Sequence, residues 1–265
     1  MKAMILAAGL GTRLRPLTND RPKALVTVAG RTLLEIALAR LREFGVREVI
    51  VNAHHYAAMI DEYLKANDGF GMRIELSREE DLLDTGGGLK KAEHFFGESL
   101  QEPFILHNVD VLSTINLGRM MQFHSERKAL ATLAVQEREA SRYLLFDTDG
   151  QLCGRRAGMG SWSPRSQNRD LGHPRDEKAE WARPSAEAQA LGFCGIHILS
   201  PRIFAQMNEV GAFSIIATYM KLAARGERII AYRADDCYWR DLGRPESIAQ
   251  AEQDVRSGRC VLAGA

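Results

Sequence analysis

A glycine-rich segment near the N-terminus carries the residue types that bind phosphate. Residues 6–18 read LAAGLGTRLRPLT, and Lys23 follows Pro22 a few positions later. Small residues let the backbone approach an anion closely, and successive N–H groups can form an anion-binding concavity. A tight glycine turn beside solvated arginines is the plainer interpretation. The nearby cations Arg13, Arg15 and Lys23 favour a polyphosphate-binding loop instead.

Two widespread phosphate-binding motifs do not fit this segment. A dinucleotide fingerprint needs Gly or Ala three residues after Gly11, where the chain has Leu14, and an acidic residue ending the second strand, where it has Asn52. No G-x-x-x-x-G-K-[ST] string, the signature of P-loop NTPases, occurs in the sequence. The sequence therefore disfavours NAD-dependent enzymes and P-loop kinases.

Composition and charge limit the class of protein in which this loop is found. The 265 residues are 45% hydrophobic and 26% charged, which is ordinary for a soluble globular chain. A formal net charge of +1 is too balanced for binding a nucleic-acid backbone, and the apolar stretch Met1–Gly9 is too short for a signal peptide or a membrane span. Cys153, Cys194, Cys237 and Cys260 contain no C-x-x-C pair. We expect a cytoplasmic protein, monomeric or a small homo-oligomer, without nucleic-acid or membrane partners.

The first half of the chain alternates between two apolar patterns. Short apolar runs interrupted by glycine are typical of strands, and i, i+3, i+4 spacing is typical of helices. One helix is expected to begin at a Thr32 cap and to end at Gly45. The expected strands are Lys2–Ala7, Glu48–Ala53, Met72–Leu76 and Pro103–Asn108. Further helices are expected over 56–66 and, after the Gly86–Gly88 run, up to Phe96. This order predicts a largely parallel sheet with helices on both faces.

The second half of the chain predicts a mixed sheet with one long interruption. Asp149 and Gly150 separate two short strand segments as a hairpin would. Residues 157–187 lose apolar periodicity, so we expect an irregular insertion there, a loop or lid. Further strands are expected over Ala129–Gln136, Leu191–Ile198 and Arg228–Tyr232, and helices over 116–127, Ser214–Ala224 and Pro245–Val255.

At these residues the sequence resembles a known family, the sugar-1-phosphate nucleotidylyltransferases. Its signature, L-A-A-G-x-G-T-R-L-x-P-L-T followed by a P-K dipeptide, is met over Leu6–Thr18 and at Pro22-Lys23. The likeness continues through Asp84–Gly88, through the strand that precedes Asp110, and through Trp239–Glu246. The resemblance implies an α/β fold that is Rossmann-like, with three layers and a mixed, mainly parallel central sheet. It also implies a single domain over 1–265, with a nucleotide-binding half over 1–135 and a sugar-binding half over 136–255.

The resemblance also implies a role for individual residues. It places the nucleotide along Leu6, Ala7, Ala8, Gly9, Gly11, Thr12, Arg13 and Lys23, and the base against Asp84, Thr85, Gly86 and Gly87. It implies catalytic roles for Arg13, Lys23, Asp110 and Asp241, with the two aspartates as metal ligands, and sugar contacts at Asn108, Gly154 and Gly195. Alone, each aspartate would more often be a turn residue or a helix cap. Together they suit Mg²⁺, which prefers oxygen ligands and keeps several waters.

Several features depart from the family pattern or admit another interpretation. Val109 precedes Asp110 where the family usually has glycine, and no E-K-P-like segment occurs, Glu177-Lys178 being a poor candidate for it. The Asp84–Gly88 segment could equally be a helix entry capped by Thr85, which is compatible with base binding by its backbone.

The remaining histidines and tryptophans receive no site role. Adjacent residues face different ways, so His54-His55 would chelate a metal poorly, and we expect these residues at the surface or behind the site. Trp162 and Trp181 lie in the irregular stretch, where tryptophan more often anchors a segment onto the core than binds a ligand.

These residues together predict a nucleotidyl transfer. A sugar phosphate oxygen would attack the α-phosphorus of a nucleoside triphosphate, giving an NDP-sugar and pyrophosphate, so catalysis is mainly charge neutralisation and in-line positioning. The Gly86–Gly88 triplet after Asp84-Thr85 looks more like the uridylyltransferases of N-acetylmuramate 1-phosphate than like typical mannose-1-phosphate guanylyltransferases. The expected substrates are therefore UTP with N-acetylmuramate 1-phosphate or a related sugar, with Mg²⁺. Alternatives are a GTP-dependent mannose- or heptose-1-phosphate guanylyltransferase, a cytidylyltransferase for a non-sugar phosphate, and a non-catalytic nucleotide-sugar-binding regulator.

Overall fold

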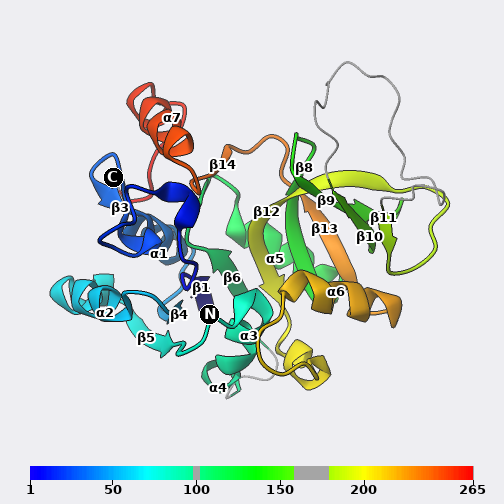
Figure 1. Cartoon of the computed structure of the whole chain (residues 1–265). Helices are drawn as coiled ribbons and strands as arrows, with labels where there is room; N and C mark the ends of the chain where they lie inside the picture. The colour runs from blue at the N-terminus through cyan, green and yellow to red at the C-terminus, as the bar shows by residue number, and fades with distance from the viewer. Residues whose placement is uncertain (98–101, 158–178, 265) are drawn as a thin grey trace.

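A large mixed sheet organises the computed structural model, which describes residues 1–97, 102–157 and 179–264 (Figure 1). Among these residues ten strands join in one sheet, ordered β11-β10-β9-β12-β6-β1-β4-β5 along the main path, with β8 pairing β12 and β13. The strands are β1 (Lys2–Leu6), β4 (Glu48–Ala53), β5 (Arg73–Arg78), β6 (Phe104–Asn108), β8 (Ala131–Gln136), β9 (Arg142–Phe146), β10 (Leu152–Ala157), β11 (Ala179–Trp181), β12 (Gln189–Leu199) and β13 (Ile229–Arg233). The helices are α1 (Leu33–Glu43), α2 (Ala57–Ala66), α3 (Asp84–Lys91), α4 (Glu93–Phe96), α5 (Leu117–Glu126), α6 (Ile215–Ala224) and α7 (Pro245–Arg256).

Strand direction changes where the first half of the chain gives way to the second. β5, β4, β1 and β6 are all parallel, as the alternation of strand and helix predicted. β12 lies antiparallel to β6, β8 and β9, whereas β13 returns parallel to β8. The mixed, mainly parallel sheet of the predicted α/β fold is confirmed.

Helices cover both faces of this sheet, because alternate side chains of each buried strand point to opposite sides. In β1, Ala3 and Ile5 join one apolar cluster, which includes buried residues of α1, α2 and α7. Met4 joins the other, with buried residues of α3, α4 and α6. Figure 1 shows α3 and α6 close together, away from α1 and α7. The predicted three layers are therefore present.

Two local expectations need correction. The last part of the 157–187 stretch is not irregular, because Ala179–Trp181 forms β11 against β10, and Trp181 packs on a small cluster with Leu145 and Cys153. Three residues carry too little periodicity to reveal a strand whose partner supplies the order. Residues 158–178, with Trp162 and Glu177-Lys178, lie outside the described residues.

The glycine run at 86–88 lies inside α3 rather than before it. Thr85 does not cap this helix; its hydroxyl oxygen instead accepts a hydrogen bond from the Ile215 N–H at the start of α6 (3.0 Å). The glycines permit close packing, since a Cβ at Gly86 would lie 2.5 Å from the Phe213 ring and one at Gly87 would lie 2.3 Å from the Gly211 carbonyl oxygen. The run therefore marks where segment 211–213 crosses the start of α3.

Replacing Gly87 with alanine is expected to lower the free energy of unfolding by about 1–3 kcal/mol, because a well-packed backbone must shift to admit the methyl group. Urea unfolding measures this change. Gly9→Ala is the matched control: nothing lies within 4 Å of a Cβ at that position, so its unfolding free energy should change by less than about 0.5 kcal/mol. Equal effects at the two positions would contradict the close approach at Gly87.

Candidate functional site

Two aspartates from distant segments meet beside the end of β6. Val111–Ser113 (β7) pairs antiparallel with Trp239–Asp241 (β14), which places Asp241 opposite Val111. The Leu242 N–H donates to the Asp110 carbonyl oxygen (2.8 Å) and continues this pairing. Asp110 and Asp241 therefore lie on adjoining backbone segments, although 131 positions separate their numbers in the chain (241 minus 110). The side chain of Val109 points into the core, so the departure from glycine there leaves the cavity unobstructed.

Both aspartates line one open cavity of about 890 Å³. The carboxyl ends of parallel strands are where ligands gather in open α/β sheets, and β6 ends here. The lining residues are Arg13, Asn108, Asp110, Val111, Arg138, Glu139, Ala140, Ser141, Arg142, Phe193, Cys194, Gly195, Trp239, Arg240, Asp241, Arg244 and Ser247. Arg13, Asp110 and Asp241, which the sequence singled out, are thus brought together.

The glycine loop folds back on itself beside this cavity. Gly11 has φ 65°, and its carbonyl oxygen accepts hydrogen bonds from the Thr18 hydroxyl (2.9 Å) and the Leu14 N–H (2.9 Å). A Cβ on Gly11 would lie 3.0 Å from Thr18 and 3.2 Å from the Lys23 side chain, so glycine suits both the backbone angle and the space. Thr12–Leu14 then form a short 3₁₀ turn that carries Arg13.

Lys23 and Arg13 bring positive charge to the aspartates. The Lys23 ammonium forms an ion pair with Asp110 Oδ2, and both side chains are largely buried. Arg13 approaches Gly243 so closely that a Cβ there would lie 2.9 Å from Arg13 Nη2 and 2.6 Å from Asp241 Oδ1. Arg13 and Asp241 thus both lie against Gly243, while Lys23 and Asp110 form an ion pair of their own.

A buried polar chain that sequence reasoning did not identify fixes the start of the loop. The Ala7 N–H donates to Asn52 Oδ1 (2.7 Å), and Asn52 Nδ2 donates to Glu79 Oε1 (2.6 Å). Glu79 Oε2 accepts from the Leu83 N–H (3.0 Å) just before α3. Glu79 and Asn52 are nearly fully buried, and they tie the ends of β1, β4 and β5 together. The available signal was the polar Asn52 near the end of the otherwise apolar strand β4.

The proposed base-binding backbone is already engaged in this structure. The N–H groups of Gly86 and Gly87 both donate to the Phe213 carbonyl oxygen (2.8 and 3.3 Å). Asp84 has φ 56°, and its Oδ1 accepts from the Thr85 N–H (2.6 Å). Of the predicted base contacts, Asp84 is the exposed one, whereas the two glycines are buried.

The residues expected to contact the sugar separate into two places. Asn108 and Gly195 line the cavity together, and a Cβ on Gly195 would lie 2.8 Å from Asn108 Nδ2. Gly154 does not line it: this residue sits in β10 under Trp181, and a Cβ there would lie 2.9 Å from the Glu180 carbonyl oxygen. Its missing side chain is explained by strand packing, which contradicts the predicted sugar contact.

Helix α7 lies beside β14, and its Ser247 lines the cavity as well. Trp239, Arg240 and Asp241 all line the cavity, and Tyr238 and Arg240 are also held by Asp254 of α7. The fully buried Asp254 carboxylate accepts from Tyr238 Oη (2.8 Å) and Arg240 Nη2 (2.7 Å). In Figure 1 α7 lies next to β14. This anchor fixes the direction in which Asp241 is presented.

Two other titratable groups near the cavity are poorly suited to act as a nucleophile or a base. Burial raises the pKa of Cys194 to about 12, so its thiol stays protonated at neutral pH. Burial lowers the pKa of His107 to about 4, so its imidazole stays neutral, and Nδ1 contacts the Asn108 carbonyl oxygen (2.7 Å). The arrangement favours charge neutralisation over covalent or general-base chemistry.

The carboxylates fit a metal that takes few protein ligands. Among residues 1–97, 102–157 and 179–264, no cluster of three or more His, Cys, Asp or Glu side chains could hold a metal ion. Asp110 already contacts a cation in Lys23, and Asp241 Oδ1 accepts from the Gly243 N–H (2.6 Å). Mg²⁺ uses one or two carboxylates and completes its shell with water and phosphate oxygens, so this donor set suits it better than a closed structural zinc site. Near the glycine loop, His54 Nδ1 contacts the Glu79 carbonyl oxygen (2.9 Å).

Comparisons with known proteins identify relatives of this chain. A family described as nucleotidyl transferase matches residues 2–156. The N-acetylmuramate alpha-1-phosphate uridylyltransferase of Caulobacter vibrioides is 34% identical over 253 residues, covering 94% of this chain and 95% of that protein. The UTP–glucose-1-phosphate uridylyltransferase of Synechocystis is 34% identical, but covers 56% of this chain and 41% of its own length. A UDP-glucose pyrophosphorylase solved with UDP-glucose has the same fold, with TM-score 0.74 and 18% identity over 97% of this chain and 99% of that one.

The helices also bear on the membrane question raised by the sequence. None of those in the described residues combines the length and the apolar character needed to cross a bilayer. All four cysteines are free, and Cys153, Cys194 and Cys260 are buried.

Proposed function

The chain belongs to the nucleotidyl transferase family, and on that premise we propose that it transfers a uridylyl group from UTP to N-acetylmuramate 1-phosphate. The products are the UDP-sugar and pyrophosphate. One observation carries the proposal: Arg13 and the Lys23–Asp110 ion pair meet Asp241 at a single cavity beside the end of β6. The near-complete overlap with an N-acetylmuramate alpha-1-phosphate uridylyltransferase supports this choice of base and sugar.

Each residue of this group has a task in the transfer. The loop from Gly9 to Arg13 binds the triphosphate, with the Arg13 guanidinium on the leaving pyrophosphate. Lys23 places a compact charge at the α-phosphate, and Asn108 with Gly195 contacts the sugar. The sugar phosphate oxygen bonds to the α-phosphorus as the bond to the β-phosphate oxygen breaks. The attacking phosphate is ionised at neutral pH, so the protein need not remove a proton.

Asp110 and Asp241 are the residues that would hold Mg²⁺. When bound, the ion neutralises phosphate charge and aligns the reacting groups. Asp241 is itself oriented by the Gly243 N–H, and its strand is held by the contacts with α7. We also propose a cytoplasmic location, which free cysteines and a balanced charge support.

The test is a substrate panel. UTP, GTP, CTP and dTTP are each offered with N-acetylmuramate 1-phosphate, N-acetylglucosamine 1-phosphate, glucose 1-phosphate and mannose 1-phosphate, and pyrophosphate release is measured with and without Mg²⁺. We expect the highest kcat/KM with UTP and an N-acetylated sugar. Preference for GTP and mannose 1-phosphate would identify a guanylyltransferase, and nucleotide-sugar binding without turnover would identify a regulator.

A further inference from the structure

The cavity has a second wall that the proposed reaction does not use. Residues 138–142, which lead from β8 into β9, line it, with Arg138 and Arg142 at the two ends of this segment. At about 890 Å³ the cavity is at the upper end of the range for small-molecule sites. There is room for a substituent beyond the sugar ring and its phosphate.

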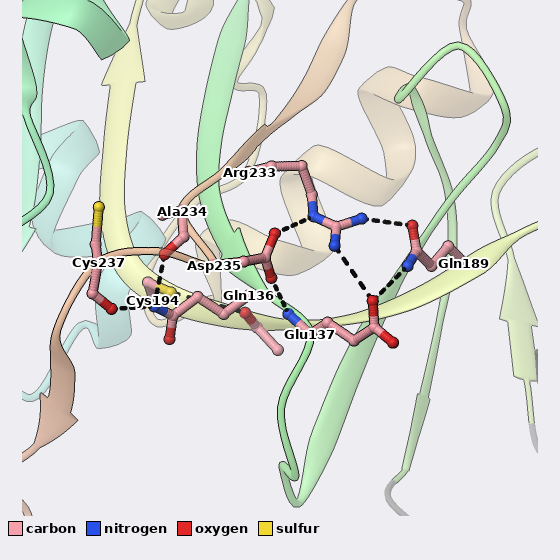
Figure 2. Close-up of polar contacts among 9 residues, drawn as sticks. Gln136, Glu137, Gln189, Cys194, Arg233, Ala234, Asp235 and Cys237 are labelled. Atoms are coloured by element: carbon pink, nitrogen blue, oxygen red, sulfur yellow. Dashed lines mark hydrogen bonds and ion pairs between the residues drawn. The ribbon is translucent and has the colours of Figure 1, made fainter. Parts of the chain in front are cut away.

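A hydrogen-bond network fixes the start of this wall (Figure 2). The Glu137 N–H donates to Asp235 Oδ1 (2.7 Å), and Arg233 Nε donates to Asp235 Oδ2 (2.6 Å). Gln136 Nε2 donates to the Ala234 and Cys237 carbonyl oxygens (2.7 and 2.8 Å). The backbone immediately before Arg138 is therefore held to the end of β13.

Arg138 is held in one position without a carboxylate partner. Its Nη2 donates to the Phe193 carbonyl oxygen (2.7 Å), and its guanidinium carbon lies 3.7 Å from the centre of the Trp239 ring. A Cβ on Gly192 would lie 2.9 Å from that carbon, so glycine leaves the space that Arg138 fills. Arg138 Nε is buried without a hydrogen-bond partner. Arg138 Nη1 donates to the Glu139 carbonyl oxygen (3.0 Å), and burial lowers the pKa of Arg138 although nearby Asp241 acts to raise it.

Arg142 adds a second uncompensated charge at the mouth of the cavity. Its side chain is exposed and makes no ion pair or hydrogen bond within the described residues. Glu139 is the acidic residue of this wall, and among the same residues its carboxylate pairs with neither arginine. Arg13 and Arg244 line the cavity from the side of the glycine loop and α7. The proposed function assigns Arg13 and Lys23 to the phosphates and gives no task to the positive charges of Arg138 and Arg142.

We propose that Arg138 and Arg142 form a subsite for a carboxylate carried by the sugar, so that the acceptors are acidic sugar 1-phosphates. This inference rests on the proposed function. The proposed transfer assigns Arg13 and Lys23 to the triphosphate, so Arg138 and Arg142 are available to a second anion on the acceptor. A neutral sugar offers hydroxyl and amide groups, which would leave these charges without an ionic partner. The lactyl ether of N-acetylmuramate carries a carboxylate of the required kind.

Two acceptors that differ in this group alone provide the test. N-acetylmuramate 1-phosphate and N-acetylglucosamine 1-phosphate share the ring, the N-acetyl group and the phosphate. With UTP and Mg²⁺, the wild-type enzyme should prefer the acidic acceptor, and Arg142→Gln should lower the ratio of the two kcat/KM values by about tenfold, the loss expected for one charge-assisted hydrogen bond. Arg228→Gln, an exposed arginine that does not line the cavity, should leave the ratio unchanged.

The other outcomes separate the possible failures. An equal loss on both acceptors would place Arg142 on the shared phosphate and overturn the carboxylate subsite. An unchanged ratio in Arg142→Gln, or a wild-type preference for the neutral acceptor, would overturn it while leaving the uridylyl transfer intact. If neither acceptor supported pyrophosphate release, the proposed function itself would be overturned.

Discussion

Replacing Asp110 with asparagine is expected to lower kcat by about two orders of magnitude or more, because the variant loses a preorganised charge at the reacting phosphates. Asparagine keeps the volume and shape of the side chain, so the cavity itself should persist. Asp241→Asn should give a loss of similar size, since both carboxylates line the same cavity from adjoining segments. Pyrophosphate release at saturating UTP, sugar phosphate and Mg²⁺ measures both effects.

The double variant tests whether the two aspartates act through one ion. If they hold the same Mg²⁺, the kcat of the double variant should be only slightly below that of the less active single variant, because residues that act as a unit are strongly non-additive. Multiplied losses would indicate independent roles. Since Asp110→Asn leaves the largely buried Lys23 without its partner, urea unfolding must show that the variant folds. Asp61→Asn, which removes a surface ion-pair partner, should keep full turnover, and full turnover in Asp110→Asn would remove the metal role.

The elements that could be predicted from the sequence are those whose structure is determined by their own residues. Strands β1, β4 and β6 are covered on both faces, so each is a compact apolar run that can be recognised in the sequence. The start of helix α1 is marked in the sequence by Thr32, whose hydroxyl oxygen accepts from the Glu35 N–H (3.1 Å). Its end is marked by Gly45, which follows it with φ 78°. Local chemistry of this kind does not depend on distant partners.

Features that depend on long-range contacts were not predictable. The three-residue strands β7 and β14 exist because each pairs with the other, and neither has a recognisable pattern. A glycine likewise indicates that there is little space for a side chain, but it does not identify the residue that occupies this space. Gly86, Gly87 and Gly154 therefore suggested ligand contacts, whereas their neighbours are Phe213, Gly211 and the β11 backbone.

The candidate site divides in the same way. Arg13, Lys23, Asp110 and Asp241 belong to one recognisable motif set. The fold places Arg13, Asp110 and Asp241 at one cavity and pairs Lys23 with Asp110. Asn52 and Arg138 are ordinary polar residues in the sequence, and their importance comes from burial. Asn52 links the loop to Glu79, and Arg138 lies against Trp239 without a carboxylate partner. Sequence reasoning found the group that meets the phosphates and missed the groups that position or select.

The second large effect is expected at Lys23, whose two possible roles differ in their consequences. If the ammonium only neutralises Asp110, then Lys23→Met should destabilise the fold and leave kcat almost unchanged. If it also meets the α-phosphate, kcat should fall by about 100-fold, the cost of removing one electrostatic group at the reacting centre. We expect the second result, because Lys23 lies against Gly11 of the proposed triphosphate loop and pairs with Asp110.

Lys23→Arg sharpens this test, since it keeps the charge and changes its shape. A planar guanidinium distributes its charge over a rigid fork, whereas the ammonium is a compact point charge. We therefore expect Lys23→Arg to restore the unfolding free energy more completely than kcat. Lys65→Met removes an exposed lysine that is paired with Asp61 and should change neither quantity. If Lys23→Met and Lys23→Arg both turned over at the wild-type rate, Lys23 would have no part at the α-phosphate, and the ion pair with Asp110 would be structural.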